Sequence, residues 1–179
     1  MKNSFLEKLI YWIKMLMVAA FFAVIVRGFV FIPMTIEGNS MEKTLNQEDH
    51  IIYEKFSDID RFDIILFKAN DGTVMVKRVV GLPGEEVAYF NDTLLINGEM
   101  IEEPYLDEIK IHHLNNHYTT NFNSEEVLGK PNLSDDAYFV LGDNRRVSKD
   151  SRSFGEVRAD QIIGKARLVY YPFKDIKLL

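Results

Sequence analysis

The feature that most constrains this chain is an apolar segment near its amino end. Residues 9–31 read LIYWIKMLMVAAFFAVIVRGFVF and carry two charges, Lys14 and Arg27. A bilayer-spanning helix needs about 20 mostly apolar residues, and basic side chains near its ends can reach the interfaces. We therefore predict a transmembrane anchor helix over residues 9–32. The chain has 179 residues, which leaves room for one globular domain after it.

Two other interpretations of this segment are a cleavable signal peptide and an amphipathic interfacial helix. Residues 24–29, VIVRGF, follow the apolar core without the small side chains that a cleavage site needs at −3 and −1. Lys2, Lys8 and Lys14 precede the core, so the positive-inside rule places residues 1–8 in the cytoplasm. We therefore expect a single-pass protein of the cell membrane with an extracytoplasmic domain.

Pro33 predicts the end of the helix, because proline has no N–H to donate and disfavours helical angles at the residue before it. Apolar Met34 and Ile36 then alternate with Thr35 and Glu37. This alternation is typical of an extended strand.

Short alternating runs rich in β-branched and aromatic residues fill much of residues 33–179. The interval 86–137 contains strands and polar loops, which predicts an insertion within this domain. No amphipathic helix of ten or more residues stands out after the anchor. We expect a mainly β, mostly antiparallel domain. The predicted strands are 50–54, 63–68, 74–82, 86–90, 93–96, 137–141 and 161–171.

Composition excludes several classes of site. The chain has no cysteine, which excludes disulfides, a thiol nucleophile and a Cys-based zinc site. Its net charge is −6 and residues 37–179 mix both signs, which argues against nucleic-acid binding. His112, His113 and His117 lie close together, but their neighbours are asparagines and a tyrosine rather than metal ligands. We interpret them as part of a solvated loop and expect no metal and no organic cofactor.

Ser40 stands in a polar turn shortly after the apolar segment. A serine hydroxyl is a poor nucleophile at neutral pH and needs a base. His50 is the nearest histidine, but Lys77 is the better candidate, since the two-residue period of a strand places it between Met75 and Val79 on one face. Burial among apolar side chains lowers the pKa of a lysine and makes it a usable base. The alternative is an exposed strand-edge lysine that prevents aggregation, and spacing alone does not decide between them.

Four sequence blocks together resemble type I signal peptidases, specifically the short single-anchor kind of Gram-positive bacteria. The resemblance implies two packed antiparallel β subdomains and a Ser/Lys dyad, in which Ser40 is acylated and Lys77 is the general base. Order and spacing both agree with the family across nearly the whole chain. The blocks are GNSMEKTL at 38–45, RFDIILF at 61–67, VKRVVGLPGE at 76–85 and LGDNRRVSKDSR at 141–152.

The resemblance also assigns supporting roles. Ser148 matches the serine that hydrogen-bonds and orients the lysine, while Asp143, Asp150 and Arg152 match residues that brace the site by charge pairing and hydrogen bonding. Arg78, next to the lysine, is counted with these supporting residues. The residues that we expect to line the substrate pockets are Met34, Ile36, Met41, Leu45 and Val76.

Three positions depart from patterns common in the family. Many members have proline where Lys43 stands, so we expect a looser turn after the nucleophile. Many have glycine where Phe62 stands, which suggests that this backbone need not adopt glycine-only angles. Some relatives have a serine at Gly38 whose hydroxyl helps to bind the oxyanion. Here we expect the Ser40 N–H and a neighbouring donor or water to take that role.

The resemblance implies a membrane-bound serine endopeptidase that removes N-terminal signal peptides from exported preproteins after small residues at −1 and −3. Its partners would be secretory preproteins and the phospholipid membrane, near the export translocon. Two alternatives stay open. One is an inactive anchored homologue that binds preproteins or regulates a partner. The other is a self-cleaving Ser/Lys repressor, in which a DNA-binding domain would replace the anchor.

Overall fold

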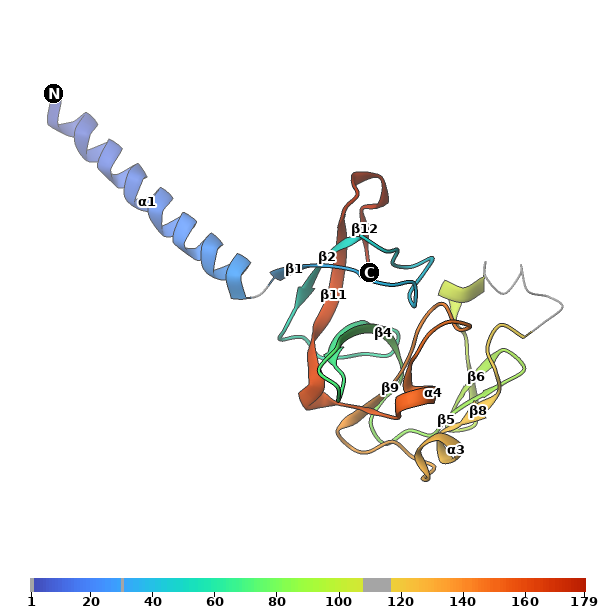
Figure 1. Cartoon of the computed structure of the whole chain (residues 1–179). Helices are drawn as coiled ribbons and strands as arrows, with labels where there is room; N and C mark the ends of the chain where they lie inside the picture. Colours follow the sequence, from blue (N-terminus) through green and yellow to red (C-terminus); the bar gives the residue numbers. More distant parts are fainter. Residues whose placement is uncertain (1, 30, 108–116) are drawn as a thin grey trace.

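A long helix and a β domain make up the chain in this computed structural model, which describes residues 2–29, 31–107 and 117–179. The helix α1 (Lys2–Phe29) projects away from the β domain (Figure 1). Its side chains over residues 5–24 are exposed, and most of them are apolar. Among the described residues, no helix reaches both the length and the apolar character that membrane crossing requires.

The helix begins and ends earlier than the range 9–32 that we predicted for it. Residues 2–8 join it because they include good helix formers such as Leu, Lys and Glu. Beyond Phe29 the chain enters β1 (Phe31–Thr35), which pairs antiparallel with β2 (His50–Glu54). Pro33 lies inside β1 rather than at the helix end. It is tolerated there because β1 is the edge strand of its sheet.

The first sheet has eight strands, paired antiparallel in the order β1-β2-β11-β3-β4-β9-β10, with β12 added to β11. Its interior strands β3 and β4 carry continuous buried runs rather than a simple alternation. The remaining strands of this sheet are β3 (Ile64–Lys68), β4 (Val74–Gly81), β9 (Ala137–Leu141), β10 (Val157–Arg158), β11 (Ile162–Tyr171) and β12 (Lys177–Leu178).

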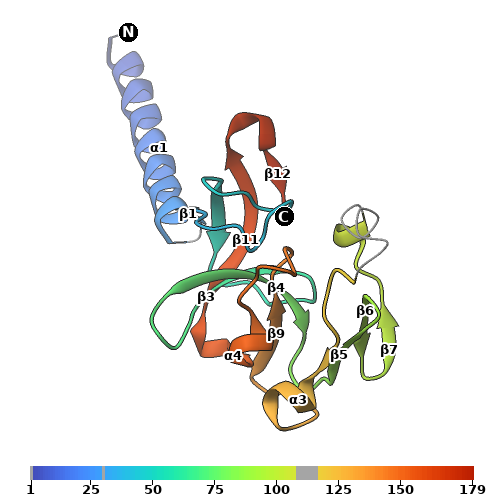
Figure 2. The ribbon, with the colours of Figure 1, turned by 45° about the vertical axis from the view of Figure 1, so that its right-hand side comes forward.

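The second sheet has four antiparallel strands in the order β7-β6-β5-β8 and falls within residues 86–137 (Figure 2). Asn97 and Gly98 join β6 to β7 with φ of 52° and 81°, the two left-handed angles that an Asn-Gly hairpin turn uses. The strands are β5 (Val87–Phe90), β6 (Thr93–Ile96), β7 (Glu99–Ile101) and β8 (Phe122–Asn123). Single-turn helices complete the domain, namely η1 (Pro104–Leu106), α3 (Ser124–Leu128), α4 (Ser151–Phe154), η2 (Ala159–Gln161) and η3 (Phe173–Asp175).

One hydrophobic cluster joins the two sheets. The rings of Tyr89, Phe122 and Phe139 stack in succession, and Phe139 belongs to the first sheet while the other two belong to the second. Gly81 ends β4 at this junction, where an added Cβ would lie 2.4 Å from a methyl carbon of Val87. The mainly β, antiparallel fold predicted from the sequence is thus confirmed. All seven predicted strands are present, and β7, β8, β10 and β12 were not predicted because two or three residues are too few to show a period.

Candidate active site

A cleft of about 860 Å³ lies between residues 34–41 and the first half of β4. Met34, Ile36, Met41 and Val76, four of the five residues that we expect to line substrate pockets, are among the residues that line it. Leu45 does not line the cleft. It is fully buried in the core, because a turn closed by its N–H on the carbonyl of Met41 (2.7 Å) packs it beside the first sheet.

Ser40 and Lys77 meet at this cleft. Lys77 Nζ lies 2.6 Å from Ser40 Oγ and 3.1 Å from the carbonyl oxygen of Val76. Lys77 is 4% exposed, so it is not an exposed edge lysine. The β3–β4 register places Lys77 opposite Ile65 of β3.

Burial lowers the pKa of Lys77 to about 8, because an ammonium group loses hydration among apolar side chains. The nearby charges of Asp150 and Asp143 act in the opposite direction and raise it. At a pKa of about 8, about a tenth of the Lys77 amines are neutral at pH 7 and able to accept a proton.

The turn that carries Ser40 is held by the loop of residues 142–150. Asn144 N–H donates to the carbonyl of Ser40 (3.0 Å), and the Asn144 side chain donates to Glu42 (3.1 Å). Gly142 makes this approach possible. A Cβ added there would lie 2.5 Å from the Ser40 carbonyl oxygen and 2.1 Å from Ser148 Oγ.

We therefore expect Gly142→Ala to reduce any reaction that depends on Ser40 by about 10²-fold, since displacements near 1 Å at a reacting group have such effects. Steady-state kinetics of the purified variant measures this. Gly164→Ala is a matched control. Its added Cβ would crowd the carbonyl oxygen of Glu54 on β2 at 2.3 Å, on the side of β11 that faces away from β4, and should lower stability without lowering kcat. Equal kcat losses in both variants would contradict the role of Gly142.

Ser148 departs from the role that the resemblance implies. Its Oγ is buried and, among the described residues, has no hydrogen-bond partner. The expected hydrogen bond to Lys77 is absent here, because the hydroxyl is packed against Gly142 while Nζ of Lys77 contacts Ser40 and Val76.

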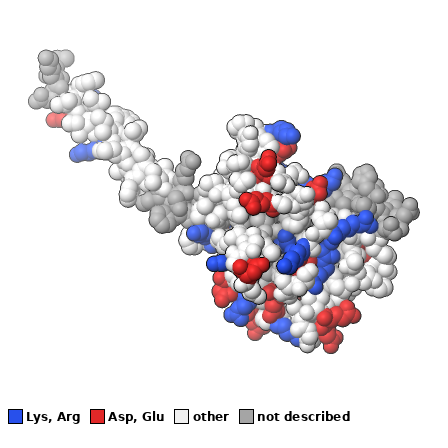
Figure 3. Space-filling model, in the orientation of Figure 1, with Lys and Arg blue, Asp and Glu red and all other residues white. Residues whose placement is uncertain are grey.

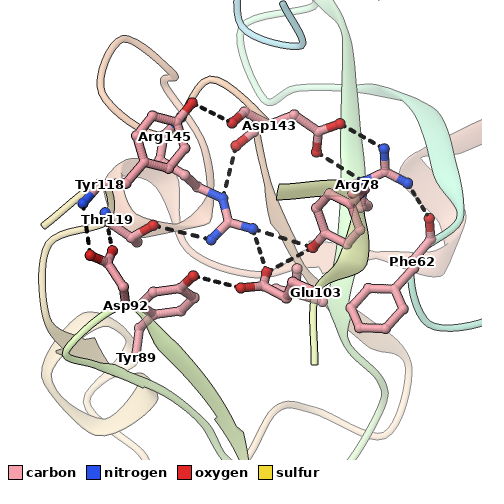
Figure 4. A network of polar contacts seen from close by, with 12 residues as sticks. Phe62, Arg78, Tyr89, Asp92, Glu103, Tyr118, Thr119, Asp143 and Arg145 are labelled. Carbon is pink, nitrogen blue, oxygen red and sulfur yellow. Dashed lines mark hydrogen bonds and ion pairs between the residues drawn. The ribbon is translucent and has the colours of Figure 1, made fainter. Parts of the chain in front are cut away.

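The other supporting residues form two ion pairs. Asp143 accepts two hydrogen bonds from Arg78, 2.9 Å from Nε and 2.6 Å from Nη2 (Figure 4). Asp150 accepts from Gly142 N–H (3.1 Å) and pairs with Arg152 at 2.8 Å. Both aspartates are fully buried, so these ion pairs fix the positions of the side chains and are not part of a solvated surface.

Phe62 and Lys43 both adopt left-handed backbone angles, with φ of 71° and 85°. The suggestion that residue 62 avoids glycine-like angles is therefore wrong. The conformation is held because Phe62 N–H donates to Val79 (2.8 Å) and its carbonyl accepts from Arg78 (2.9 Å). At residue 43 the φ value is one that proline, locked near −65°, cannot adopt.

The histidine cluster lies largely beyond the described residues, which omit His112 and His113. His117 is described and lies 3.3 Å from a carboxylate oxygen of Asp92. No group of three or more His, Asp or Glu side chains within the described ranges is arranged to hold a metal ion.

Sequence reasoning missed a buried network behind the 142–150 loop. Arg145 pairs with Glu103, and the Tyr118 hydroxyl donates to the carbonyl of Asp143 (2.8 Å). Arg145 stands in a recognised block and could have been suspected. Nothing local in the sequence marks Glu103 or Tyr118 as its neighbours.

Comparisons with known proteins agree with this architecture. The family model described as "Signal peptidase, peptidase S26" matches residues 9–171. Signal peptidase I of Bacillus caldolyticus is 47% identical and aligns with 83% of this chain and 84% of its own. Signal peptidase IB of Staphylococcus aureus strain Mu50 is 39% identical, over 99% of this chain and 95% of its own.

A solved structure shows the same relationship. The crystal structure of a signal peptidase I from Enterococcus faecalis V583 superimposes with a TM-score of 0.59 at 42% identity. The match covers 62% of this chain and 98% of that one. A shared fold at this identity, together with the family match over most of the sequence, means that the chain belongs to the peptidase S26 family of signal peptidases.

Proposed function

We propose that this chain is a serine endopeptidase that cleaves N-terminal signal peptides from exported preproteins after small residues at −1 and −3. The observation that carries the proposal is the 2.6 Å contact between Lys77 Nζ and Ser40 Oγ at the wall of an open cleft. Ser40 is the proposed nucleophile and Lys77 the proposed general base. No metal or organic cofactor takes part in these steps.

The substrate is proposed to bind as an added strand. Among the described strands, β9 pairs with β4 only from Arg78 onward, so residues 74–77 have one edge without a strand partner. An extended peptide can hydrogen-bond to such an edge through its main chain. Met34, Ile36 and Val76 line the cleft beside it, and their apolar side chains are proposed to form the pockets for small side chains at −1 and −3.

The reaction moves two protons in turn, and Lys77 carries each of them. Neutral Lys77 takes the proton from Ser40 as Oγ bonds to the scissile carbonyl carbon, and the ammonium then gives that proton to the leaving amine as the peptide bond breaks. Water next attacks the acyl ester while Lys77 takes its proton. The ester bond to Ser40 breaks, and the serine oxygen recovers the proton.

The developing oxyanion needs hydrogen-bond donors. Within the described part of the chain the Ser40 N–H donates no hydrogen bond, so it is available for this role. Gly38 has no hydroxyl to contribute, and its φ of 84° disfavours any side chain there. We assign the oxyanion to Ser40 N–H together with a water molecule.

The rate of cleavage should depend on the protonation of Lys77. Its pKa lies below the ordinary 10.5, at about 8, and only the neutral amine accepts a proton. Below pH 8 the value of kcat/KM should therefore fall about tenfold per pH unit, and above pH 8 it should level off. Initial rates from pH 6 to 10 at constant ionic strength measure this, and a flat profile through pH 8 would count against Lys77 as the base.

We also propose that α1 anchors the protein in the membrane, with its amino end in the cytoplasm. The helix projects from the domain with exposed apolar side chains, including Phe21 and Phe22, and the visible face of its described part carries few charges (Figure 3). The sequence from residue 9 to residue 26 contains one charged residue, Lys14. Burial of this surface in lipid would remove it from water. Protease added outside sealed cells should digest the β domain, and protection of that domain would overturn the orientation.

The direct test of function is cleavage of a labelled preprotein by the purified full chain in detergent. We expect one cut after an Ala-X-Ala sequence, with the new amino end identified by mass spectrometry. A preprotein with tryptophan at −1 should resist cleavage. Binding of the preprotein without any cut would instead favour an inactive homologue.

A further inference from the structure

The second sheet is joined to the loop that carries the site by a fully buried ion pair. The side chains of Glu103, which follows β7, and Arg145 are both inaccessible to solvent. Tyr89 and Tyr105 donate their hydroxyls to the same carboxylate, at 2.5 and 2.7 Å (Figure 4). Although burial works to raise the pKa of Glu103, Arg145 beside it brings it below its usual value. Glu103 is therefore a charged anchor point within the second subdomain.

Arg145 and Tyr118 carry this anchor to the backbone of the loop. Arg145 Nε donates to the carbonyl of Gly142 (3.1 Å), while the Tyr118 hydroxyl donates to the carbonyl of Asp143 (2.8 Å) and accepts from Arg145 N–H (3.3 Å). Two of these three contacts tie residues 142–145 to Tyr118, outside the loop, and the third is made within the loop by Arg145, which Glu103 holds from outside. Within this loop, Asn144 holds the Ser40 carbonyl at 3.0 Å.

A buried ion pair is a poor device for stability alone, because the loss of hydration of two charges offsets most of their attraction. It does impose one geometry, since an arginine fork matches its partners only in a narrow range of positions. The loop has little room to shift around Gly142, because it approaches Ser40 closely there. Fixing this loop therefore also fixes the nucleophile relative to Lys77.

We propose that Glu103 and Tyr118 are positioning residues of the active site, and that the second subdomain serves to hold the 142–145 loop against Ser40. This inference rests on the proposed peptidase function. Glu103 acts through Arg145, and Tyr118 acts through the backbone of Asp143 and Arg145. Among the described residues, neither is one of those that line the cleft.

Tyr118→Phe tests the proposal with little change in shape, since it removes one hydroxyl and keeps the ring. We expect kcat for a preprotein to fall about tenfold, with KM within about twofold, because the nucleophile is displaced while the peptide-binding edge of β4 is intact. Glu103→Gln should lower kcat further by leaving Arg145 charged, and Glu103→Asp should restore part of it. If Glu103→Gln does not fold, Tyr118→Phe alone decides.

Ser124→Ala is the matched control. Ser124 is buried in the same subdomain, where its hydroxyl accepts from Val87 N–H (3.2 Å) and donates to the Pro131 carbonyl. Among the described residues, its hydrogen bonds reach no residue of the loop. At a similar loss of melting temperature, Ser124→Ala should leave kcat unchanged. An equal fall of kcat in Ser124→Ala and Tyr118→Phe would overturn the proposal, because the network would then act only through stability.

Hydrogen exchange gives a readout that does not require activity. The Asn144 amide, bonded to the Ser40 carbonyl, should lose protection in Tyr118→Phe and keep it in Ser124→Ala. If the wild-type chain cleaves no preprotein but this difference is found, the proposed function fails while the loop-positioning role survives. If the wild type cleaves and Tyr118→Phe matches it in both kcat and Asn144 protection, the positioning role fails.

Discussion

Replacing Ser40 with alanine, or Lys77 with methionine, should each lower preprotein cleavage by about 10⁴-fold or more, and the double replacement should cause no further loss. The two groups act as one unit, because the hydroxyl attacks only as the amine removes its proton. Each single variant therefore removes the whole pathway. Methionine has an unbranched side chain one atom shorter than that of lysine, and it has no basic atom.

Single-turnover cleavage with mass analysis of the product measures these losses. Lys68→Met is the control, since Lys68 is an exposed lysine on the neighbouring strand β3 and should be replaced without loss of activity. Processing by Lys77→Met within tenfold of wild type would exclude Lys77 as the base. Additive losses in the double variant would show that the two residues act separately.

Lys77→Met should also be more stable than the wild type. A loss of cleavage in this variant could then not be attributed to unfolding. The pKa of Lys77 is lowered to about 8, so at pH 7 the ammonium is less favourable in the folded chain than in the unfolded one. Removing it should stabilise the protein by up to about 3 kcal/mol at pH 7. The gain should shrink as pH rises from about 8 to 10.5, where the wild-type chain becomes more stable. Urea unfolding at pH 7 and pH 10 measures this trend.

Asp143→Asn should lower the free energy of unfolding by about 3–5 kcal/mol, since it leaves the guanidinium of Arg78 buried without its counter-charge. Arg78 is 8% exposed and donates two hydrogen bonds to this carboxylate, one to each oxygen. The amide of asparagine has only one oxygen that can accept, so one of the two hydrogen bonds would be lost. Because the charge of Asp143 also raises the pKa of Lys77, the pH profile of remaining activity should move to lower pH.

Chemical denaturation of purified Asp143→Asn gives the loss of stability, and kinetics of its folded fraction give the pH profile. Asp160→Asn is the matched control, because Asp160 forms an exposed ion pair with Arg158. This variant should unfold at the same denaturant concentration as the wild type. If Asp143→Asn also unfolds there, the Arg78 pair is not needed for the fold. A pH profile displaced upward would contradict the electrostatic link to Lys77.

Local patterns in the sequence determined the strands, the Asn-Gly hairpin and the turn that bears Ser40. They also placed Lys77 on a strand among apolar neighbours, although they left open whether that strand lay inside the sheet or at its edge. Strand periodicity and turn chemistry depend on a few adjacent residues, so a sequence displays them directly. The four motif blocks then indicated the family.

Tertiary structure decided which of these local elements meet. Ser40 and Lys77 are 37 residues apart, and their contact depends on the register of β4 and on the loop that carries Asn144. Leu45 and Ser148 do not lie where we predicted, because neighbouring segments pack Leu45 into the core and the Ser148 hydroxyl against Gly142. Glu103 reaches Arg145 across 42 residues. Such contacts are selected by the packing of the two sheets against each other, and no short stretch of sequence contains that information.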